Sequence, residues 1–125
     1  MNIPENLKYT KDHEWIKVEG TAGTIGVTEY AQGELGDVIY VDITASGEIN
    51  QGDSCGTIEA VKTVSDVFAP VSGTIKEANT AINDNPAVVN KDPYGEGWIL
   101  KIELKNPAEL DSLMDAAAYK ELIGA

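Results

Sequence analysis

The side chain that could carry chemistry in this 125-residue chain is the amine of Lys62. It lies between two runs of β-forming residues, 55–59 and 63–68, which predict a hairpin with Lys62 near its tip. A lysine at a tip keeps its hydration and offers a primary amine that a modifying enzyme can reach. Most lysines on turns are only solvated surface charges, so the amine alone does not define a function.

Other reactive side chains do not combine into a catalytic site. The chain has one histidine, His13, and one cysteine, Cys55. A nucleophilic triad needs a base beside its nucleophile, whereas Cys55 lies in a strand-like segment and is expected to be a small core residue. One histidine without cysteine partners makes a poor zinc site, so His13 is expected to be a hydrogen-bonded structural residue. We therefore expect a protein that is not an enzyme and holds no metal.

Composition narrows the classes of partner and location. The formal net charge of −12 argues against nucleic acid and anionic membranes, because phosphate binding needs a basic patch. One cysteine forms no internal disulfide and suits a reducing compartment. No run approaches the ~18 apolar residues of a membrane span, and residues 1–6 lack signal or transit character. A cytoplasmic protein of bacterial type is expected, or a mitochondrial matrix protein only if a transit peptide has been removed.

The elements that must position Lys62 follow from periodicity and turn residues. Residues 13–19 alternate, with Trp15 and Lys17 on one face, which is typical of a half-buried strand. Thr28 is expected to cap a short helix that ends at Gly36. Further strands are expected at 7–9, 24–27, 37–43, 73–78 and 98–104, with turns at 45–47, 50–53 and 83–86. Many short strands with glycine turns predict a β-sandwich or a flattened barrel.

The C-terminal segment is expected to be one helix. Asn106 can cap it, and Pro107 and Glu109 suit its first turn. An apolar stripe at helical spacing follows, formed by Leu110, Leu113, Met114 and Ala117. Such a stripe is expected to pack on the sheet.

Several motifs in sequence order resemble one known family. Glu59-x-x-Lys62, followed by Ala69-Pro70-x-Ser72-Gly73, resembles the lipoyl-attachment hairpin of the glycine cleavage system H-protein family. The other matching segments are His13-Glu14-Trp15, 24–28, 30–32, 35–37 and Asn90-x-x-Pro93-Tyr94-Gly95-x-Gly97-Trp98. The resemblance implies a mainly β barrel-sandwich hybrid, like lipoyl and biotinyl domains, with a short internal helix and a C-terminal helix. The expected single domain spans 1–125, with a core at about 7–104 and the C-terminal helix at about 107–122.

The same resemblance implies a carrier whose cofactor, lipoate, is attached to Lys62. In that family the arm shuttles the methylamine group of glycine from a pyridoxal-phosphate glycine decarboxylase to a tetrahydrofolate-dependent aminomethyltransferase. Dihydrolipoyl dehydrogenase then reoxidises the arm. The family pattern assigns Glu59 and Gly47 to recognition by the lipoate-attaching enzyme. It assigns Glu14 and Asp66 to the cleft that holds the loaded arm, with Asp12 beside them. A monomer is expected.

Alternative interpretations remain open at this point. Biotin carriers flank their lysine with methionines, and 2-oxoacid dehydrogenase lipoyl domains place aspartate before it, whereas Val61 and Thr63 flank Lys62 here. A related swinging-arm domain from another system is thus the second interpretation. The third is an H-like protein that relays lipoate to other lipoyl domains, or a small hydrolase built on Cys55. Glu59 could instead form a cross-hairpin salt bridge worth about 0.2–1 kcal/mol. The acids Asp12, Glu14 and Asp66 could be solvated surface charges.

Overall fold

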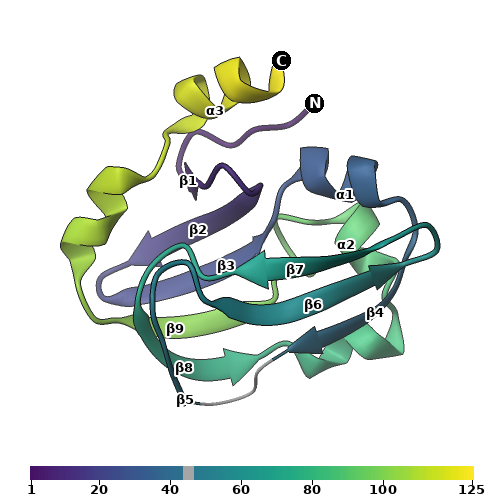
Figure 1. Ribbon diagram of the computed structural model, residues 1–125, viewed down its shortest axis with the longest axis horizontal. Coiled ribbons are helices and arrows are strands. Elements are labelled where there is room, and N and C mark those ends of the chain that lie inside the picture. Colours follow the sequence, from purple (N-terminus) through teal and green to yellow (C-terminus); the bar gives the residue numbers. More distant parts are fainter. Residues whose placement is uncertain (44–46) are drawn as a thin grey trace.

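The computed structural model describes residues 1–43 and 47–125, and in them the chain folds into two layers of antiparallel strands. One sheet has six strands in the order β1-β2-β3-β9-β8-β5, and the other has three in the order β4-β6-β7 (Figure 1). The strands are β1 (Lys8–Tyr9), β2 (Glu14–Glu19), β3 (Ala22–Val27), β4 (Val38–Ile43), β5 (Gly47–Ile49), β6 (Ser54–Ala60), β7 (Val64–Phe68), β8 (Gly73–Ala78) and β9 (Leu100–Leu104). The predicted mainly β sandwich is confirmed.

Five short helices complete the described part of the chain. They are α1 (Glu29–Leu35), the 3-10 helix η1 (Thr80–Asp84), α2 (Val88–Lys91), the 3-10 helix η2 (Pro107–Ser112) and α3 (Ala116–Ile123). Thr28 caps α1 as predicted, and Gly36 ends it with a φ of 79°. The turn expected at 83–86 lies at the junction of η1 and α2. Most of the turn expected at 45–47 lies outside the described residues, and Gly47 begins β5.

The main core lies between the two sheets. Alternation in β9 places Leu100, Ile102 and Leu104 inward and leaves the two residues between them exposed. Strands β6 and β7 contribute Ile58 and Val67 to the same core. The hairpin that carries Lys62 is therefore fixed at its base by buried apolar side chains on both strands.

A second, smaller core covers the outer face of β2. The alternation predicts that Trp15 shares a face with the exposed Lys17, yet Trp15 is buried with Tyr9 and Tyr119. Gly26 makes room for the indole, because a Cβ at that position would lie 2.6 Å from the ring. The indole Nε1 donates hydrogen bonds to the carbonyls of Val27 and Pro93, both at 3.0 Å. Both faces of this part of the sheet are thus covered.

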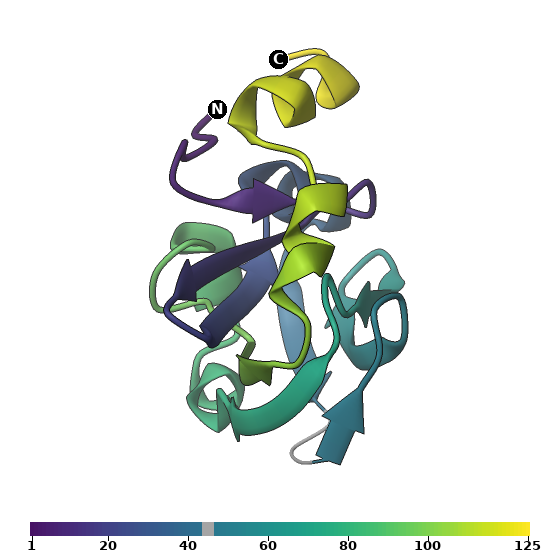
Figure 2. The same ribbon diagram turned by 90° about the vertical axis from the view of Figure 1, so that its left-hand side faces the viewer.

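The single C-terminal helix expected over about 107–122 is wrong, because the segment divides into η2 and α3 (Figure 2). Between them, Met114 is extended and pairs with Tyr9 through backbone hydrogen bonds of 2.8 and 2.9 Å. Asp115 then caps α3 by accepting a hydrogen bond from the Ala118 amide at 2.8 Å. The expected stripe is divided as well, since Leu113 packs on the main core and Ala117 is exposed.

No helix in the described residues combines the length and the apolar character needed to cross a membrane.

Candidate functional site

Lys62 lies at the tip of the β6–β7 hairpin, as predicted. The Ala60 amide donates a hydrogen bond to the Thr63 carbonyl at 2.8 Å, and Val61 and Lys62 form the turn between them. Among the described non-glycine residues only His13 has a positive φ, so this turn uses backbone angles that a β-branched valine accepts. The Lys62 side chain is exposed and has no ion pair within the described residues. Its amine is therefore open to a modifying enzyme.

The hairpin tip is anchored to the end of α1. The Val61 amide donates to the Asp37 carbonyl at 3.0 Å. Lys62 passes over Gly36, where a Cβ would lie 3.9 Å from the Lys62 Cδ. Because the tip is tied at its backbone, the mobility of an attached group would come from the side chain and the group itself.

Asn90, on α2, fixes the segment to which the tip is tied. Its Oδ1 accepts a hydrogen bond from the Val38 amide at 3.0 Å. Its Nδ2 donates to the Gly36 carbonyl at 2.8 Å and to Gln32 Oε1 at 3.0 Å. Sequence reasoning missed this role, and the signal that could have found it is one amide side chain in the apolar run 87–90.

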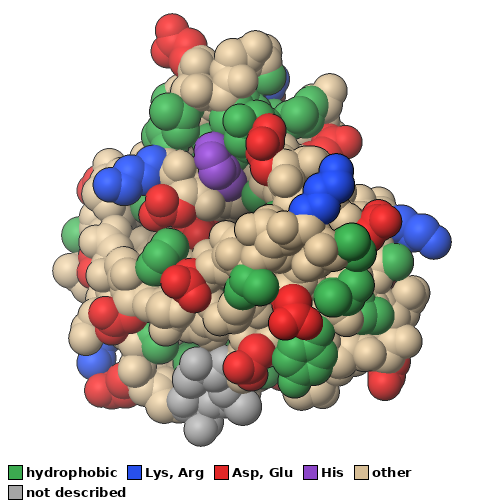
Figure 3. All heavy atoms as spheres, turned by 45° about the vertical axis from the view of Figure 1, so that its right-hand side comes forward, with side chains coloured by type: hydrophobic (Ala, Val, Ile, Leu, Met, Phe, Trp, Pro, Cys, Tyr) green, Lys and Arg blue, Asp and Glu red, His purple; other side chains and the backbone are tan. Residues whose placement is uncertain are grey.

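Apolar side chains surround the tip on the outer face of the small sheet. A register shift between Val38 and Tyr40 turns both Ile39 and Tyr40 to solvent, where they are 49% and 48% exposed. Val61 and Val64, on the hairpin, are 68% and 60% exposed. We call these four side chains the tip patch. Figure 3 shows apolar side chains beside acidic ones on this side of the molecule.

The acids next to the tip patch lie in cross-strand rows. Glu59 is the register partner of Tyr40 on β4 and of Val64 on β7. Two residues before Glu59 on β6, Thr57 is the register partner of Asp42 on β4 and of Asp66 on β7. The alternative that Glu59 forms a salt bridge across the hairpin is wrong, because no such pair occurs within the described residues.

Gly47 is not part of this neighbourhood. It begins β5 with a φ of 105°, a conformation that side chains other than glycine rarely adopt. Strand β5 belongs to the large sheet and lies toward the end of the sandwich away from the hairpin tip (Figure 1). The structure therefore does not bring Gly47 together with Lys62 and Glu59.

Glu14 is a buried carboxyl group, only 2% exposed. Its Oε1 accepts a hydrogen bond from the Thr10 hydroxyl at 2.6 Å, and its Oε2 accepts one from the Phe68 amide at 3.2 Å. Burial raises the pKa of Glu14 to about 7, although both hydrogen bonds act in the opposite direction. A group with this pKa exchanges its proton near neutral pH.

Glu14 and Asp66 line one cleft of about 110 Å³ between α1, the start of β2 and the hairpin. Asp12 and Glu34 line it as well, beside the apolar side chains of Val27, Leu35 and Ile58. We call this the acidic cleft. A larger cleft of about 330 Å³ shares Asp12 and Glu14 and extends along Phe68 to Met114. The structure thus brings Asp12, Glu14 and Asp66 together in one cleft, where their carboxylates could bind a cation.

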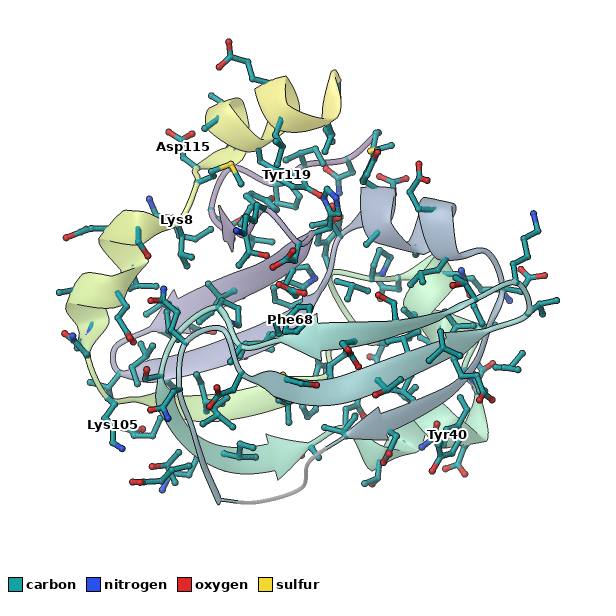
Figure 4. The ribbon with its side chains drawn as sticks, in the orientation of Figure 1. Lys8, Tyr40, Phe68, Lys105, Asp115 and Tyr119 are labelled. Atoms are coloured by element: carbon teal, nitrogen blue, oxygen red, sulfur yellow. The ribbon has the colours of Figure 1, made fainter. Side chains whose placement is uncertain are left out.

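Cys55 and His13 hold structural positions, as predicted. Cys55 is fully buried, its Sγ donates to the Val67 carbonyl at 3.3 Å, and burial raises the pKa of its thiol to about 12. His13 Nδ1 lies 2.9 Å from the Tyr119 hydroxyl, and Figure 4 shows Tyr119 pointing from α3 toward the sheet. Within the described residues, no three His, Cys, Asp or Glu side chains are grouped as metal ligands would be.

Comparisons with known proteins give a consistent result. The model of the Glycine cleavage H-protein family matches residues 7–125. A glycine cleavage system H protein of Bacteroides fragilis is 52% identical over 126 residues, which cover 100% of both chains. One from Symbiobacterium thermophilum is 56% identical over 119 residues, covering 94% of this chain and 93% of the other. The crystal structure of a glycine cleavage system H protein from Mycobacterium marinum superimposes with a TM-score of 0.90 at 38% identity, covering 98% of this chain and 100% of that one.

Proposed function

Because this chain belongs to the glycine cleavage H-protein family, we propose that it carries lipoate as an amide on the Lys62 side chain. It is a non-catalytic lipoyl carrier of the glycine cleavage system. The observation that supports the attachment site is the exposed Lys62 amine on a turn whose backbone is tied to Asp37. An amine without an ion pair can lose its proton and react without breaking a contact of the folded protein.

The proposal assigns the arm to transfer between enzymes. The arm takes the methylamine group of glycine from the pyridoxal-phosphate glycine decarboxylase to the tetrahydrofolate-dependent aminomethyltransferase. Dihydrolipoyl dehydrogenase then reoxidises the arm. Bound lipoate would supply a disulfide that thiol–disulfide chemistry opens and recloses. The chain's own part is to hold the attachment point rigidly and to present it to each partner. We include the whole chain, 1–125, as one carrier domain in this proposal.

We assign the acidic cleft to the loaded arm between visits. A loaded arm ends in an amine that is cationic at neutral pH, and Glu14 and Asp66 are the carboxylates that would hold it. A cation near Glu14 lowers the pKa of that buried carboxyl and keeps it ionised. Protonation of Glu14 would weaken the hold, so retention should decline as the pH falls through the pKa of the loaded form.

We assign the tip patch and its acids to contacts with the partner enzymes. A partner surface that fits it has an apolar recess for Tyr40 and Val64, bordered by basic side chains that face Glu59 and Asp66. Within this proposal the lipoate-attaching enzyme recognises Glu59 by direct contact. Gly47 is assigned to the same recognition, and the support for its role is its φ of 105° at the start of β5, a conformation that side chains other than glycine rarely adopt. A monomer acting in the cytoplasm is part of the same proposal, and a single buried free cysteine fits that compartment.

Intact-mass measurement tests the attachment site. Protein incubated with lipoate, ATP and a lipoate-attaching enzyme should gain one lipoyl group per chain. Lys62→Arg should gain none, since arginine keeps the charge but cannot form this amide. Lys76→Arg, an exposed lysine on β8, is the matched control and should be modified like the parent. A lipoyl gain that survives Lys62→Arg would refute the assignment.

The shuttle itself has a separate test. Lipoyl protein mixed with glycine and the pyridoxal-phosphate glycine decarboxylase should gain the methylamine group, and Lys62→Arg should not. A chain that is lipoylated but never loaded would contradict the transfer role while leaving the attachment site intact.

A further inference from the structure

The loop 11–13 between β1 and β2 is unusual at His13. The Thr10 amide donates to the Glu14 carbonyl at 3.0 Å, and the His13 amide donates to the Thr10 carbonyl at 3.1 Å. This is a short hairpin loop whose last residue takes a left-handed conformation, a position that favours glycine. His13 occupies it with a φ of 72°. A bulky residue persists in such a conformation only when its surroundings hold it there.

Contacts from two helices hold His13. Its Nδ1 lies 2.9 Å from the hydroxyl of Tyr119 on α3. Its ring packs on Tyr30 of α1, with the ring centroids 4.7 Å apart and the planes inclined by 49°. Its carbonyl accepts a hydrogen bond from the Thr28 amide at 3.0 Å. The histidine is therefore fixed by both its side chain and its backbone.

The Tyr119 hydroxyl is the junction of this network. It lies 2.8 Å from Thr28 Oγ1, which also accepts the Ala31 amide as the cap of α1. Burial lowers the pKa of His13, so the neutral ring can accept at Nδ1. Thr28 can then donate to Tyr119, and Tyr119 can donate to His13. One hydroxyl thus joins α3, the cap of α1 and the β1–β2 loop.

The loop held in this way carries two acids of the acidic cleft. Asp12 and Glu14 flank His13 in sequence, and all three residues line the cleft. Glu14 is also held by the Thr10 hydroxyl, which accepts the Glu14 amide at 3.1 Å. A change in the backbone angles of His13 would alter the direction of both neighbouring carboxyl groups.

We infer that Tyr119 is a positioning residue: acting through His13, it holds the β1–β2 loop in the conformation that directs Asp12 and Glu14 into the acidic cleft. This inference rests on the proposed function for the use of the cleft, but the geometry that it describes belongs to the chain without its cofactor. Tyr119 itself need not touch the arm.

Measurement of the Glu14 pKa tests this link. The groups whose charges influence Glu14 or His13 are Asp12 on the same loop, Glu34 on α1, Cys55 on β6 and Tyr119 on α3. Carbon-detected NMR titration of Glu14 in protein without lipoate reports how well the cleft excludes water. In Tyr119→Phe the ring remains but the hydroxyl is lost, and the pKa of Glu14 should fall by about one unit as water enters.

A double-mutant cycle separates positioning from general weakening. His13→Ala removes the ring that Tyr119 and Tyr30 hold, and alanine does not favour the left-handed conformation, so this variant should lower the Glu14 pKa like Tyr119→Phe. The double variant should show no further decrease. Tyr94→Phe is the matched control, because it removes another hydroxyl of the second core, one that contacts Asn2 and Glu29. It should leave the Glu14 pKa unchanged.

Two results would overturn the inference. One is a Glu14 pKa that stays the same in His13→Ala, which tests the link even if Tyr119→Phe folds poorly. The other is a pair of decreases that simply add in the double variant. Because the titration uses protein without lipoate, it is independent of whether Lys62 is the attachment site. Retention of the loaded arm in Tyr119→Phe, compared with Tyr94→Phe, then tests the assigned use of the cleft separately.

Discussion

Two ionisable side chains, Glu14 and Lys62, occupy opposite environments. Glu14 is buried and accepts hydrogen bonds from the Thr10 hydroxyl and the Phe68 amide. Lys62 is exposed to solvent and has no ion pair in the described part of the chain. Burial penalises the ionised carboxylate, and exposure leaves the ammonium hydrated. Burial of Glu14 thus costs stability, whereas exposure of the Lys62 amine, the proposed attachment point, costs none.

Glu14→Gln should change how stability depends on pH. The pKa of Glu14 is raised from 4.5 to about 7, so the folded state binds this proton more tightly than the unfolded state does. Its stabilising contribution is fully present below the unfolded pKa and is lost as the pH rises through about 7. The free energy of unfolding of the variant, measured relative to that of the parent, should therefore increase by up to about 3 kcal/mol as the pH rises from acid to mildly alkaline.

Urea unfolding of both proteins at about pH 4 and about pH 8 measures this gain. Replacing the exposed Glu121 by glutamine is the matched control, and its offset from the parent should vary little with pH. A constant offset for Glu14→Gln at both pH values would contradict the raised pKa.

Among the elements, the β6–β7 hairpin depends on supports that are distant in sequence. Its base is held by the main core, and its tip by the Asp37 carbonyl. The segment that contains Asp37 is itself fixed by Asn90 of α2 through Val38 and Gly36. The stiffness of the tip is therefore a property of three elements together and not of the hairpin alone.

Asn90→Ala should loosen the tip. The change removes three hydrogen bonds and leaves the Val38 amide and the Gly36 carbonyl without this partner. A loss of about 2–3 kcal/mol in the free energy of unfolding is expected. Amide exchange at Ala60 and Val61 should accelerate by about tenfold or more beyond the change at β9.

Asn90→Asp separates the accepted hydrogen bond from the two donated ones. It keeps an acceptor for the Val38 amide and loses the bonds to Gly36 and Gln32. It should give an intermediate exchange rate at the tip. Uniform acceleration throughout the chain, with no excess at Ala60 and Val61, would show that Asn90 supports the whole fold and not the tip in particular.

At the scale of the whole molecule, charge and apolar surface meet at one end. The chain carries a formal net charge of −12, and Glu59 and Asp66 lie beside the exposed tip patch. Long-range attraction to a basic partner surface would orient this end first, and burial of the apolar side chains would then stabilise the contact.

The association rate with the glycine decarboxylase, the proposed partner, should fall with ionic strength. Because exposed charges are screened by salt, a decrease of about tenfold is expected between about 50 mM and about 500 mM salt. Asp66→Asn should lower the rate at low salt and reduce the salt dependence. Glu121→Gln, on α3, should do neither. Stopped-flow fluorescence measures both, and a rate that does not change with salt would rule out steering.

The sequence supports predictions where the signal is local. The alternation of 98–104 predicts β9, the flanking β-forming runs predict the hairpin, and the lone cysteine predicts a core residue; each is confirmed. These features depend on neighbours within a few residues, which pattern reasoning can read. The position of Lys62 at the hairpin tip belongs to the same class.

Features that depend on distant partners could not be read in this way. The C-terminal helix breaks because Met114 pairs with Tyr9, and Trp15 is buried in a second core that also draws on Tyr94 and Tyr119. Glu14 is buried because β7 supplies the Phe68 amide, 54 residues away. The register shift that exposes Ile39 leaves no mark in a run of β-forming residues. In each case tertiary contacts override the local pattern.

The second core also has a consequence for biosynthesis. Tyr119 joins His13 across 106 residues, so the β1–β2 loop leaves the ribosome long before the hydroxyl that secures it. At roughly 5–20 residues per second, that interval lasts about 5–20 s. During it, Tyr9 lacks the Tyr119 ring that stacks on it in the folded protein. The acidic cleft can therefore take its final form only at the end of translation.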